Sequence, residues 1–331
     1  MQYIPFQNIP IELSQVVLGT DYFGTTRSRE DSFRMMDAYT ERGGNVLDTA
    51  RVYGAWFPGG DGASERTVGA YVKERGLRHK IVISSKAGHP PLDDMHQGRL
   101  DRAEITADVD TGLLQLGTDY IDILWLHRDD VSKPVEEIID TLDGLVKQGK
   151  ILSYGASNWT AKRLQEANAY AAKSGKRPFA ASQIQWSLAV CHHIADDTLV
   201  QMDTAEETFY AASKLPVFAF SSQAKGFFEK YDKNTLSEKA DGRYNTPDNV
   251  ARYRRLKQIS QKTGISLSAL ALGYLLCNRT FPVLPIIGGS KPEQIADSMS
   301  ILDTGIPEEI LEWRKKQSKQ SLLRCGSTVQ K

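Results

Sequence analysis

The chain of 331 residues carries 41 basic and 41 acidic side chains, so its formal net charge is zero. Because the charges are balanced and no long run of one sign occurs, nothing in the composition favours binding to nucleic acid or to an anionic membrane. Three cysteines (Cys191, Cys277 and Cys325) lie far apart without a paired spacing, which is typical of a reducing compartment rather than of a disulfide framework.

The first residues, 1–6, have neither the basic segment nor the apolar core of a signal peptide. No apolar run in the chain reaches the roughly 18 residues that a membrane-spanning helix needs. We therefore expect a cytoplasmic protein that does not insert into membranes. The amino-terminal stretch itself is expected to form a small hairpin.

After this stretch, strand-like and helix-like patterns alternate along the chain. Short apolar runs predict strands near residues 16–19, 45–48, 81–85, 120–126, 151–156, 181–185, 216–220 and 283–287. Longer periodic patterns predict helices over residues 30–42, 64–75, 103–116, 135–148, 161–173, 249–263 and 267–277.

Boundary signals accompany several of these helices. We expect Ser64, just before Glu65, to be an N-cap and Pro134 to lie in a first turn. Four glycines follow the expected helix ends: Gly43, Gly76, Gly149 and Gly264.

The alternation predicts a parallel sheet, and strands of this number closing on themselves make a single-domain (β/α)8 TIM barrel over residues 1–331. A doubly wound open sheet is the alternative. The Gly-x-Gly-x-x-Gly sequence that would follow its first strand is missing, because residues 18–24 have the wrong glycine spacing. Two long irregular stretches, 53–63 and 223–247, are expected to form lids over the strand ends.

Three strand-like runs each lead to an ionisable residue: Asp48 with Tyr53 five residues later, Lys86, and His127. In parallel α/β proteins the carboxyl ends of the strands share one rim, so these four side chains are expected to meet there. Each of three residues, considered alone, also has a structural interpretation. Asp48 could cap the following segment, Tyr53 could be a packing residue, and His127 could be a hydrogen-bonded structural histidine. Lys86 needs a partner at the end of an apolar strand, and Asp48 on the neighbouring strand is the obvious one.

In this arrangement the chain resembles the aldo-keto reductases, (β/α)8 barrels that reduce carbonyls with a nicotinamide cofactor. The family's Asp, Tyr, Lys and His tetrad matches Asp48, Tyr53, Lys86 and His127 in order and spacing. Further similar pieces are residues 155–158, Gln183 after the sixth strand, residues 219–221 after the seventh, and residues 286–294 after the eighth. The resemblance implies a small-molecule carbonyl or alcohol as substrate and leaves the oligomeric state open.

A mechanism follows from the chemistry of these groups. Carbonyl reduction develops negative charge on oxygen, so the site needs a proton donor. We expect Tyr53 to donate, with the Lys86 ammonium favouring the phenolate and Asp48 holding Lys86 charged. His127 would position the carbonyl by a hydrogen bond.

The resemblance also implies a set of nucleotide ligands. Ser157, Asn158 and Gln183 match the ligands of the nicotinamide carboxamide, and Phe220 matches the aromatic residue that stacks on the ring. The residues expected along the ribose and the pyrophosphate are Gly19, Thr20, Asp21 and Ser221. For Ser157, Asn158 and Ser221, simple turn formation is the alternative.

At the adenosine end the chain departs from many NADP-using members. It has Gly288, Gly289, Ser290 and Lys291, then Gln294, so Lys291 is the one obvious cation for a 2'-phosphate. With Ser290 as a second donor, NADP(H) is the expected cofactor and NAD(H) the alternative. A solvated surface charge is the other interpretation of Lys291.

The expected substrate pocket combines indoles with polar groups: Trp56, Trp159, Trp186, Arg128 and Asp129. Flat indoles beside hydrogen-bonding groups suit a sugar, a sugar-derived ketone or a small polar aldehyde. The alternative is that Trp56 and Trp159 only pack the loops, with Arg128 and Asp129 forming a local ion pair.

Two other functions remain open from the sequence. Barrel enzymes that form a Schiff base also have a lysine at a strand end, so Lys86 could act in that way. A reductase fold can also act as a nucleotide-binding sensor or regulatory subunit. No metal is expected, because the adjacent His192 and His193 would point to opposite sides of an extended segment. Cys191 is expected as a small buried apolar residue.

Overall fold

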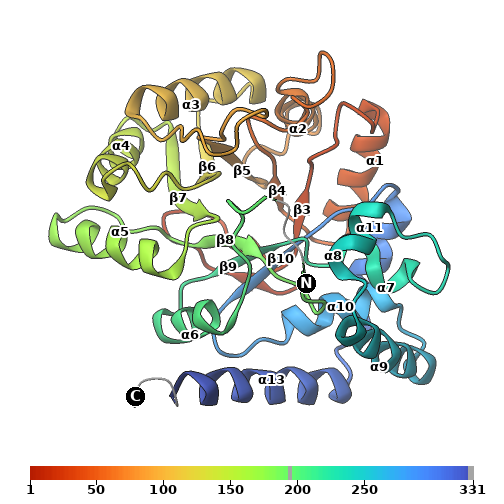
Figure 1. Cartoon of the computed structure of the whole chain (residues 1–331). Helices are drawn as coiled ribbons and strands as arrows, with labels where there is room; N and C mark the ends of the chain where they lie inside the picture. The colour runs from red at the N-terminus through yellow and green to blue at the C-terminus, as the bar shows by residue number, and fades with distance from the viewer. Residues whose placement is uncertain (193–195, 327–331) are drawn as a thin grey trace.

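The computed structural model describes residues 1–192 and 196–326 (Figure 1). Its centre is a closed barrel of parallel strands in the order β10-β3-β4-β5-β6-β7-β8-β9. The barrel strands are β3 (Val17–Gly19), β4 (Val46–Asp48), β5 (Val82–Ala87), β6 (Ile121–Leu126), β7 (Ile151–Ser157), β8 (Ser182–Gln185), β9 (Val217–Phe220) and β10 (Val283–Ile287). This confirms the expected (β/α)8 barrel, and each strand overlaps a predicted one.

Helices surround the barrel, as Figure 1 shows in a view along its axis. Those predicted from periodicity are α1 (Arg29–Thr40), α2 (Ala63–Glu74), α3 (Arg102–Leu116), α4 (Val135–Lys147), α5 (Ala161–Lys173), α9 (Pro247–Thr263) and α10 (Leu267–Leu276). Those without a prediction are α6 (Thr204–Ser213), the 3-10 turn η1 (Ala224–Gly226), α7 (Phe227–Lys230), α8 (Glu238–Tyr244), α11 (Pro292–Met299), α12 (Ile301–Thr304) and α13 (Glu308–Gly326). None of the described helices is long and apolar enough to cross a membrane.

The strand register brings the ionisable strand ends to one rim. Asp48 on β4 pairs with Ser84 on β5, and Lys86 pairs with Trp125 on β6. His127 follows β6 directly, and its backbone N–H donates to the carbonyl of Ala87 at 2.8 Å. Neighbouring parallel strands therefore hold three of the four tetrad positions within one layer of the barrel.

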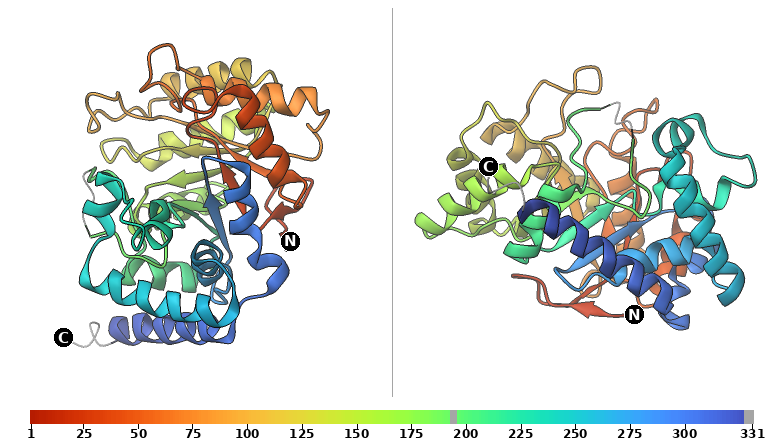
Figure 2. Two further views of the ribbon diagram at one scale, coloured as in Figure 1. Left: turned by 90° about the vertical axis from the view of Figure 1, so that its right-hand side faces the viewer. Right: turned by 60° about the horizontal axis from the view of Figure 1, so that its bottom comes forward.

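The predicted amino-terminal hairpin is present. β1 (Tyr3–Ile4) pairs antiparallel with β2 (Leu13–Ser14), and Figure 2 shows this hairpin at one end of the barrel. Phe6, with Ile9 and Leu13, packs into an apolar cluster that contains the first residues of several barrel strands. The hairpin thus covers the amino-terminal end of the barrel, opposite the rim that carries the tetrad.

One cap prediction was wrong. The residue before α2 is Gly62 in a left-handed conformation, φ 66°, and Ser64 lies inside the helix. The Ser64 hydroxyl is buried and donates to the carbonyl of Thr20 at 2.7 Å, so it joins α2 to the loop after β3 instead. Pro134 is the cap residue of α4 rather than a member of its first turn. The four glycines expected just past helix ends do follow α1, α2, α4 and α9, and all four have positive φ: Gly43, Gly76, Gly149 and Gly264.

The expectation of an irregular stretch over residues 223–247 was also wrong. This stretch folds as η1, α7 and α8, which are three, four and seven residues long. Such short helices span at most about two turns, too little for a helical period to emerge from the sequence. Residues 53–63, by contrast, form a series of turns.

Candidate active site

The tetrad centres on a buried ion pair between Lys86 and Asp48. The Lys86 Nζ lies 2.5 Å from Asp48 Oδ2 and also donates to the carbonyl of Thr49 at 2.7 Å. The two side chains are only 1% and 3% exposed. Burial lowers the pKa of Lys86, while the neighbouring Asp48 carboxylate opposes that shift.

The second carboxylate oxygen of Asp48 also accepts hydrogen bonds. Its Oδ1 accepts from Ser84 Oγ at 2.9 Å and from Gln183 Nε2 at 3.0 Å. The indole N–H of Trp125 in turn donates to Ser84 Oγ at 2.7 Å. Four strands therefore fix the orientation of one carboxylate, and through it the position of the Lys86 ammonium.

Tyr53 lies over this ion pair. The Lys86 Nζ is 4.6 Å from the centroid of the Tyr53 ring, and the imidazole ring of His127 is 5.7 Å from it. Burial, followed by the negative charges of Asp48 and Asp21, raises the pKa of Tyr53 well above its ordinary value of 10. In the site as described, Tyr53 is a neutral phenol that retains its proton at physiological pH.

His127 is a buried, neutral imidazole. Burial, followed by the nearby His89 and Arg128, lowers the pKa of His127 well below its ordinary value. The His89 ring lies edge-on at 4.6 Å, and Asn158 Nδ2 donates to the His127 backbone carbonyl at 3.2 Å. The His127 Nδ1 is buried without a hydrogen-bond partner in the described part of the chain.

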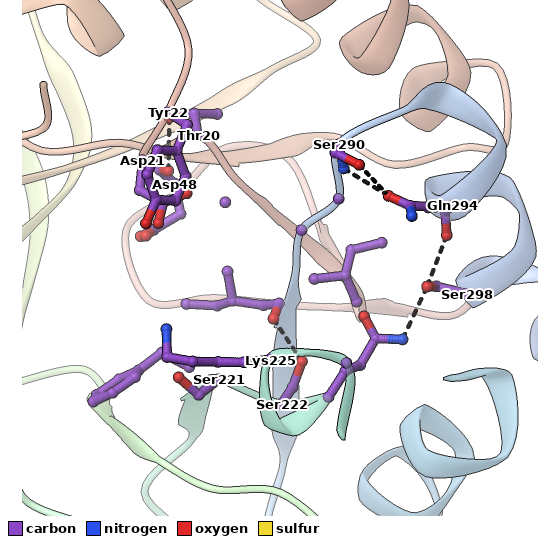
Figure 3. A pocket seen from close by; sticks show the side chains of 18 of the residues that line it. Thr20, Asp21, Tyr22, Asp48, Ser221, Ser222, Lys225, Ser290, Gln294 and Ser298 are labelled. Carbon is purple, nitrogen blue, oxygen red and sulfur yellow. Dashed lines mark hydrogen bonds between the residues drawn. The ribbon is translucent and has the colours of Figure 1, made fainter. Parts of the chain in front are cut away.

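The tetrad opens into a cavity of about 1090 Å³, part of which is shown in Figure 3. Asp48, Tyr53 and His127 lie in its wall. Of the nucleotide ligands implied by the resemblance, the cavity is lined by Gly19, Thr20, Asp21, Ser157, Asn158, Gln183, Phe220, Ser221, Gly288, Ser290 and Gln294. The fold thus collects residues from the ends of seven strands, all but β5, around one space.

Two of these residues also have structural roles. Asn158 has φ 60°, a conformation that asparagine tolerates better than most residues, and its Oδ1 accepts from the backbone N–H of Val200 at 3.1 Å. Gln183 is bonded to Asp48. Asn158 therefore forms a turn, as the alternative interpretation expected, and it also lines the cavity.

At the far end of the cavity, Ser290 and Gln294 bind each other. The backbone N–H and the hydroxyl of Ser290 both donate to Gln294 Oε1, at 2.7 and 3.1 Å (Figure 3). Lys291 is exposed and does not line the cavity, whereas Glu293 and Asp297 do. The structure thus places Lys291, the cation expected at the 2'-phosphate, outside the lining of this cavity.

Two of the three indoles expected in the substrate pocket lie in packing positions instead. Trp159 is fully buried, with its ring 5.1 Å from Phe179 and its N–H donated to the carbonyl of Arg128 at 3.3 Å. Trp186 packs against Phe281 at 5.7 Å, with the Arg314 guanidinium 4.9 Å over its ring. Neither lines the cavity, and both are buried, so neither ring is open to a ligand there.

The third indole remains beside the tetrad. Trp56 does not line the cavity either, but it is 40% exposed, and its ring lies 6.0 Å from Tyr53 and 6.3 Å from Tyr22, which both do. Tyr22 is 42% exposed and lines the cavity. The rim next to the phenol is therefore aromatic.

Arg128 and Asp129 do not pair with each other. Arg128 lines the cavity, and its guanidinium binds Asp196 at 3.1 Å and Thr198 Oγ1 at 2.9 Å. Asp129 instead binds Arg163 at 3.4 Å. The alternative of a local Arg128–Asp129 ion pair was wrong, because Arg128 binds a residue of the loop after β8 and Asp129 binds a residue of α5.

Some features of the site had no sequence prediction. His89, which contacts His127, lies three residues beyond Lys86. Because it follows a strand end so closely, its position at the same rim could have been predicted from the sequence. A group of cations from η1 and α8 also lines the cavity. An irregular lid over residues 223–247 carries no register from which the position of these cations could be predicted.

The remaining expectations concern residues away from the cavity. Cys191 is buried, as expected. His193 lies outside the described residues, and so does the side chain of Cys325. In the portions of the chain that are described, no group of three metal-ligating side chains is found.

Comparison with known proteins places this site in a family. The aldo/keto reductase family model matches residues 15–315. A putative aryl-alcohol dehydrogenase of Saccharomyces cerevisiae is 30% identical over 321 residues, covering 92% of this chain and 82% of that protein. The norsolorinic acid reductase of Emericella nidulans is 28% identical, covering 90% and 76%, and the NADP(+) aryl-alcohol dehydrogenase of Phanerodontia chrysosporium is 28% identical, covering 92% and 81%. The chain belongs to the aldo/keto reductase family and is an oxidoreductase.

Proposed function

We propose that this protein interconverts a carbonyl compound and its alcohol with NADP(H), and that Tyr53 is the proton donor. The observation that carries the proposal is a neutral phenol at the cavity wall, over a Lys86–Asp48 pair with a 2.5 Å contact. A bound nicotinamide dinucleotide supplies the hydride in the reduction direction. The cavity volume of about 1090 Å³ and the phosphate-attracting cations in its wall fit such a ligand.

The proton follows a short path. As hydride reaches the carbonyl carbon, negative charge develops on the carbonyl oxygen, and the Tyr53 O–H donates its proton there. The phenolate left behind is stabilised by the Lys86 ammonium, which Asp48 holds in place through the 2.5 Å contact. Solvent then returns a proton to Tyr53, and alcohol oxidation uses the same groups in reverse.

His127 fits the role of the group that positions the carbonyl. A neutral imidazole carries one N–H, on either Nδ1 or Nε2. Because Nδ1 has no acceptor to which it could donate, we assign the lone pair to Nδ1 and the N–H to Nε2. A donor at Nε2 is suited to the carbonyl oxygen that also receives the Tyr53 proton. Because His127 is neutral, it does not compete with Tyr53 as the acid.

The Schiff-base alternative is disfavoured by the same geometry. Attack on a carbonyl carbon requires an uncharged amine with free access, whereas the Lys86 Nζ is buried and held by Asp48 and the Thr49 carbonyl. Borohydride trapping with a carbonyl substrate tests this directly, and covalent labelling of Lys86 would contradict the reductase proposal.

For the substrate we propose a flat carbonyl compound that stacks on the aromatic rim of Tyr22 and Trp56. The expectation of a sugar or small polar carbonyl relied on three indoles, and two of them pack elsewhere. The Arg128 guanidinium, which was expected to pair substrate hydroxyls, already binds Asp196 and Thr198. The names of the relatives, aryl-alcohol dehydrogenases and norsolorinic acid reductases, point in the same direction.

The experiment is a substrate panel assayed with NADPH and NADH and followed by the absorbance of the reduced nicotinamide. We expect turnover of carbonyls, with kcat/KM higher for aryl aldehydes and ketones than for sugar carbonyls. A consistent preference for sugars would restore the polar-substrate expectation. Tight retention of nucleotide with no turnover across the panel would instead indicate a sensor or regulatory subunit.

A further inference from the structure

Hydrogen bonds hold the backbone of His127 but not its imidazole ring. The His127 N–H donates to the carbonyl of Ala87 at 2.8 Å, and its own carbonyl accepts from Asn158 Nδ2 at 3.2 Å. Within residues 1–192 and 196–326, neither ring nitrogen forms a hydrogen bond. The outer torsion angle of a histidine side chain has two broad minima, so this angle alone does not decide which way round the ring lies. The orientation of the ring therefore depends on the groups that pack against it.

Among the described residues, two aromatic rings contact that of His127. The centroid of the Tyr53 ring lies 5.7 Å away, with an interplanar angle of 72°, and that of His89 lies 4.6 Å away, with an angle of 71°. Edge-to-face contacts of this kind are a preferred arrangement of aromatic rings. Tyr53 lines the cavity, whereas His89 is half-buried and lies outside its lining. His89 is thus the nearer ring, and it restrains His127 from outside the group of reacting side chains.

His89 is itself firmly held in the loop after β5. Its Nδ1 lies 2.6 Å from the carbonyl oxygen of Pro90, which can only accept, so Nδ1 carries the proton. The His89 carbonyl accepts from Arg99 Nη1 at 3.0 Å. The N–H of the preceding Gly88 donates to Asp108 Oδ2 at 2.9 Å, and Asp108 also binds Arg99 at 3.3 Å. Because Asp108 belongs to α3, the loop is tied to that helix and the His89 ring has a fixed position.

His89 makes this contact without adding a charge beside the tetrad. Burial, followed by the positive charge of Arg128, lowers the pKa of His89 to about 4 from its ordinary value of 6.5. The ring is therefore neutral near pH 7, with its one N–H donated to the Pro90 carbonyl. It offers His127 an aromatic surface, which a phenylalanine in the same place would also offer.

We propose that His89 is a positioning residue, which holds the His127 imidazole with Nε2 directed at the carbonyl oxygen of the substrate. The inference rests on the proposed function, in which His127 positions that carbonyl. A His127 ring turned by half a revolution would place a C–H in the position of Nε2 and lose the hydrogen bond. Both the rate and the choice of the carbonyl face that receives hydride should therefore depend on His89.

The experiment compares two complementary substitutions in the full-length protein. His89→Asn keeps an N–H donor for the Pro90 carbonyl and removes the ring, whereas His89→Phe keeps a ring and removes the donor. His79→Asn is the matched control, because His79 is exposed and precedes β5, at the opposite end of the barrel. The measurements are kcat and KM with the best aryl carbonyl of the substrate panel, the Kd of NADPH, and the enantiomeric excess of the alcohol formed from acetophenone.

His89→Asn should lower kcat/KM roughly tenfold to a hundredfold, the loss that a small displacement of a reacting group causes, and should also lower the enantiomeric excess. The Kd of NADPH should not change, and both His89→Phe and the control should behave as the parent does. In a His127→Ala background, His89→Asn should cause no further loss, because no imidazole remains to be positioned.

Unchanged kcat/KM and enantiomeric excess in His89→Asn would overturn the inference and leave the reductase proposal intact. An equal loss in His89→Phe would do the same, since the N–H and not the ring would then matter, and so would a further loss of full size in the His127→Ala background. If His89→Asn lost NADPH binding together with activity, His89 would only maintain the fold of the loop, which also overturns the inference. A parent protein that turns over no carbonyl overturns the proposed function itself.

Discussion

Lys86 and Asp48 form an ion pair with a 2.5 Å contact whose members are almost completely removed from solvent. Removing one member of such a pair leaves an unpaired buried charge, which typically costs roughly 3–5 kcal/mol of folding free energy. Lys86→Met should therefore lose stability as well as activity. The Lys86→Met, Asp48→Asn double variant should recover much of the stability and remain inactive.

Urea unfolding and turnover measured on the parent, the two single variants and the double variant check this prediction. Asp48→Asn keeps a side-chain oxygen to accept from Ser84 or Gln183, so it is the milder single change. If Lys86→Met were as stable as the parent, the buried pair would not have the energetic role that its geometry indicates.

Tyr53→Phe should separate chemistry from binding. The substitution removes the O–H and keeps the ring that lies between the Lys86 ammonium and Trp56. General acid catalysis is typically worth about a hundredfold to ten-thousandfold, so kcat should fall by at least the lower figure. The Kd of NADPH should change little. Residual activity within about threefold of the parent would show that another group donates the proton.

The tetrad could be predicted because its members have fixed offsets from strand ends. Register between parallel neighbours then brings Asp48, Lys86 and His127 to one rim, and no further information is needed. The apolar runs that form the barrel strands are equally local, and the predicted strands matched for the same reason.

Side-chain direction beyond the strand ends could not be predicted in this way. Asn158 turns the chain with φ 60°, so Trp159, the next residue, points to Phe179 and away from the cavity. Partner choice is still less local. Arg128 binds Asp196, 68 residues later, and Asp129 binds Arg163, 34 residues later. Such contacts depend on how loops and helices that are distant in the chain meet, which a single sequence does not report.

The aromatic rim provides a test of the substrate proposal. Trp56→Ala removes an exposed ring beside Tyr53, so it should lower kcat/KM for aryl carbonyls more than for small aliphatic aldehydes. Its effect on stability should be within about 0.5 kcal/mol, as is usual for exposed positions. Trp159→Ala is the matched control, because that indole is fully buried and its loss should destabilise the fold by roughly 3–5 kcal/mol. Equal losses for both substrate classes in Trp56→Ala would contradict a stacking role.

Glu65 gives a prediction about pH. This carboxyl on α2 is 1% exposed and accepts from the Ser85 hydroxyl at 2.6 Å, directly behind the strand that carries Lys86. Burial raises its pKa to about 7 from an ordinary value of 4.5, although the Ser85 hydrogen bond and the nearby Arg51 oppose the shift. The folded protein therefore binds a proton here more tightly than the unfolded chain does.

The sign of the effect follows from linkage. Stability contributed by the neutral carboxyl is fully present below the unfolded pKa and declines as pH rises through the folded pKa, because the buried group must then ionise. One pKa unit corresponds to about 1.4 kcal/mol, so the loss between pH 4.5 and 8 is on the order of 3 kcal/mol. Glu65→Gln cannot ionise and can still accept from Ser85, so it should gain stability relative to the parent as pH rises. Urea unfolding of both proteins at pH 5 and pH 8 measures this directly, and a stability difference that is the same at the two pH values would show that Glu65 does not titrate in this range.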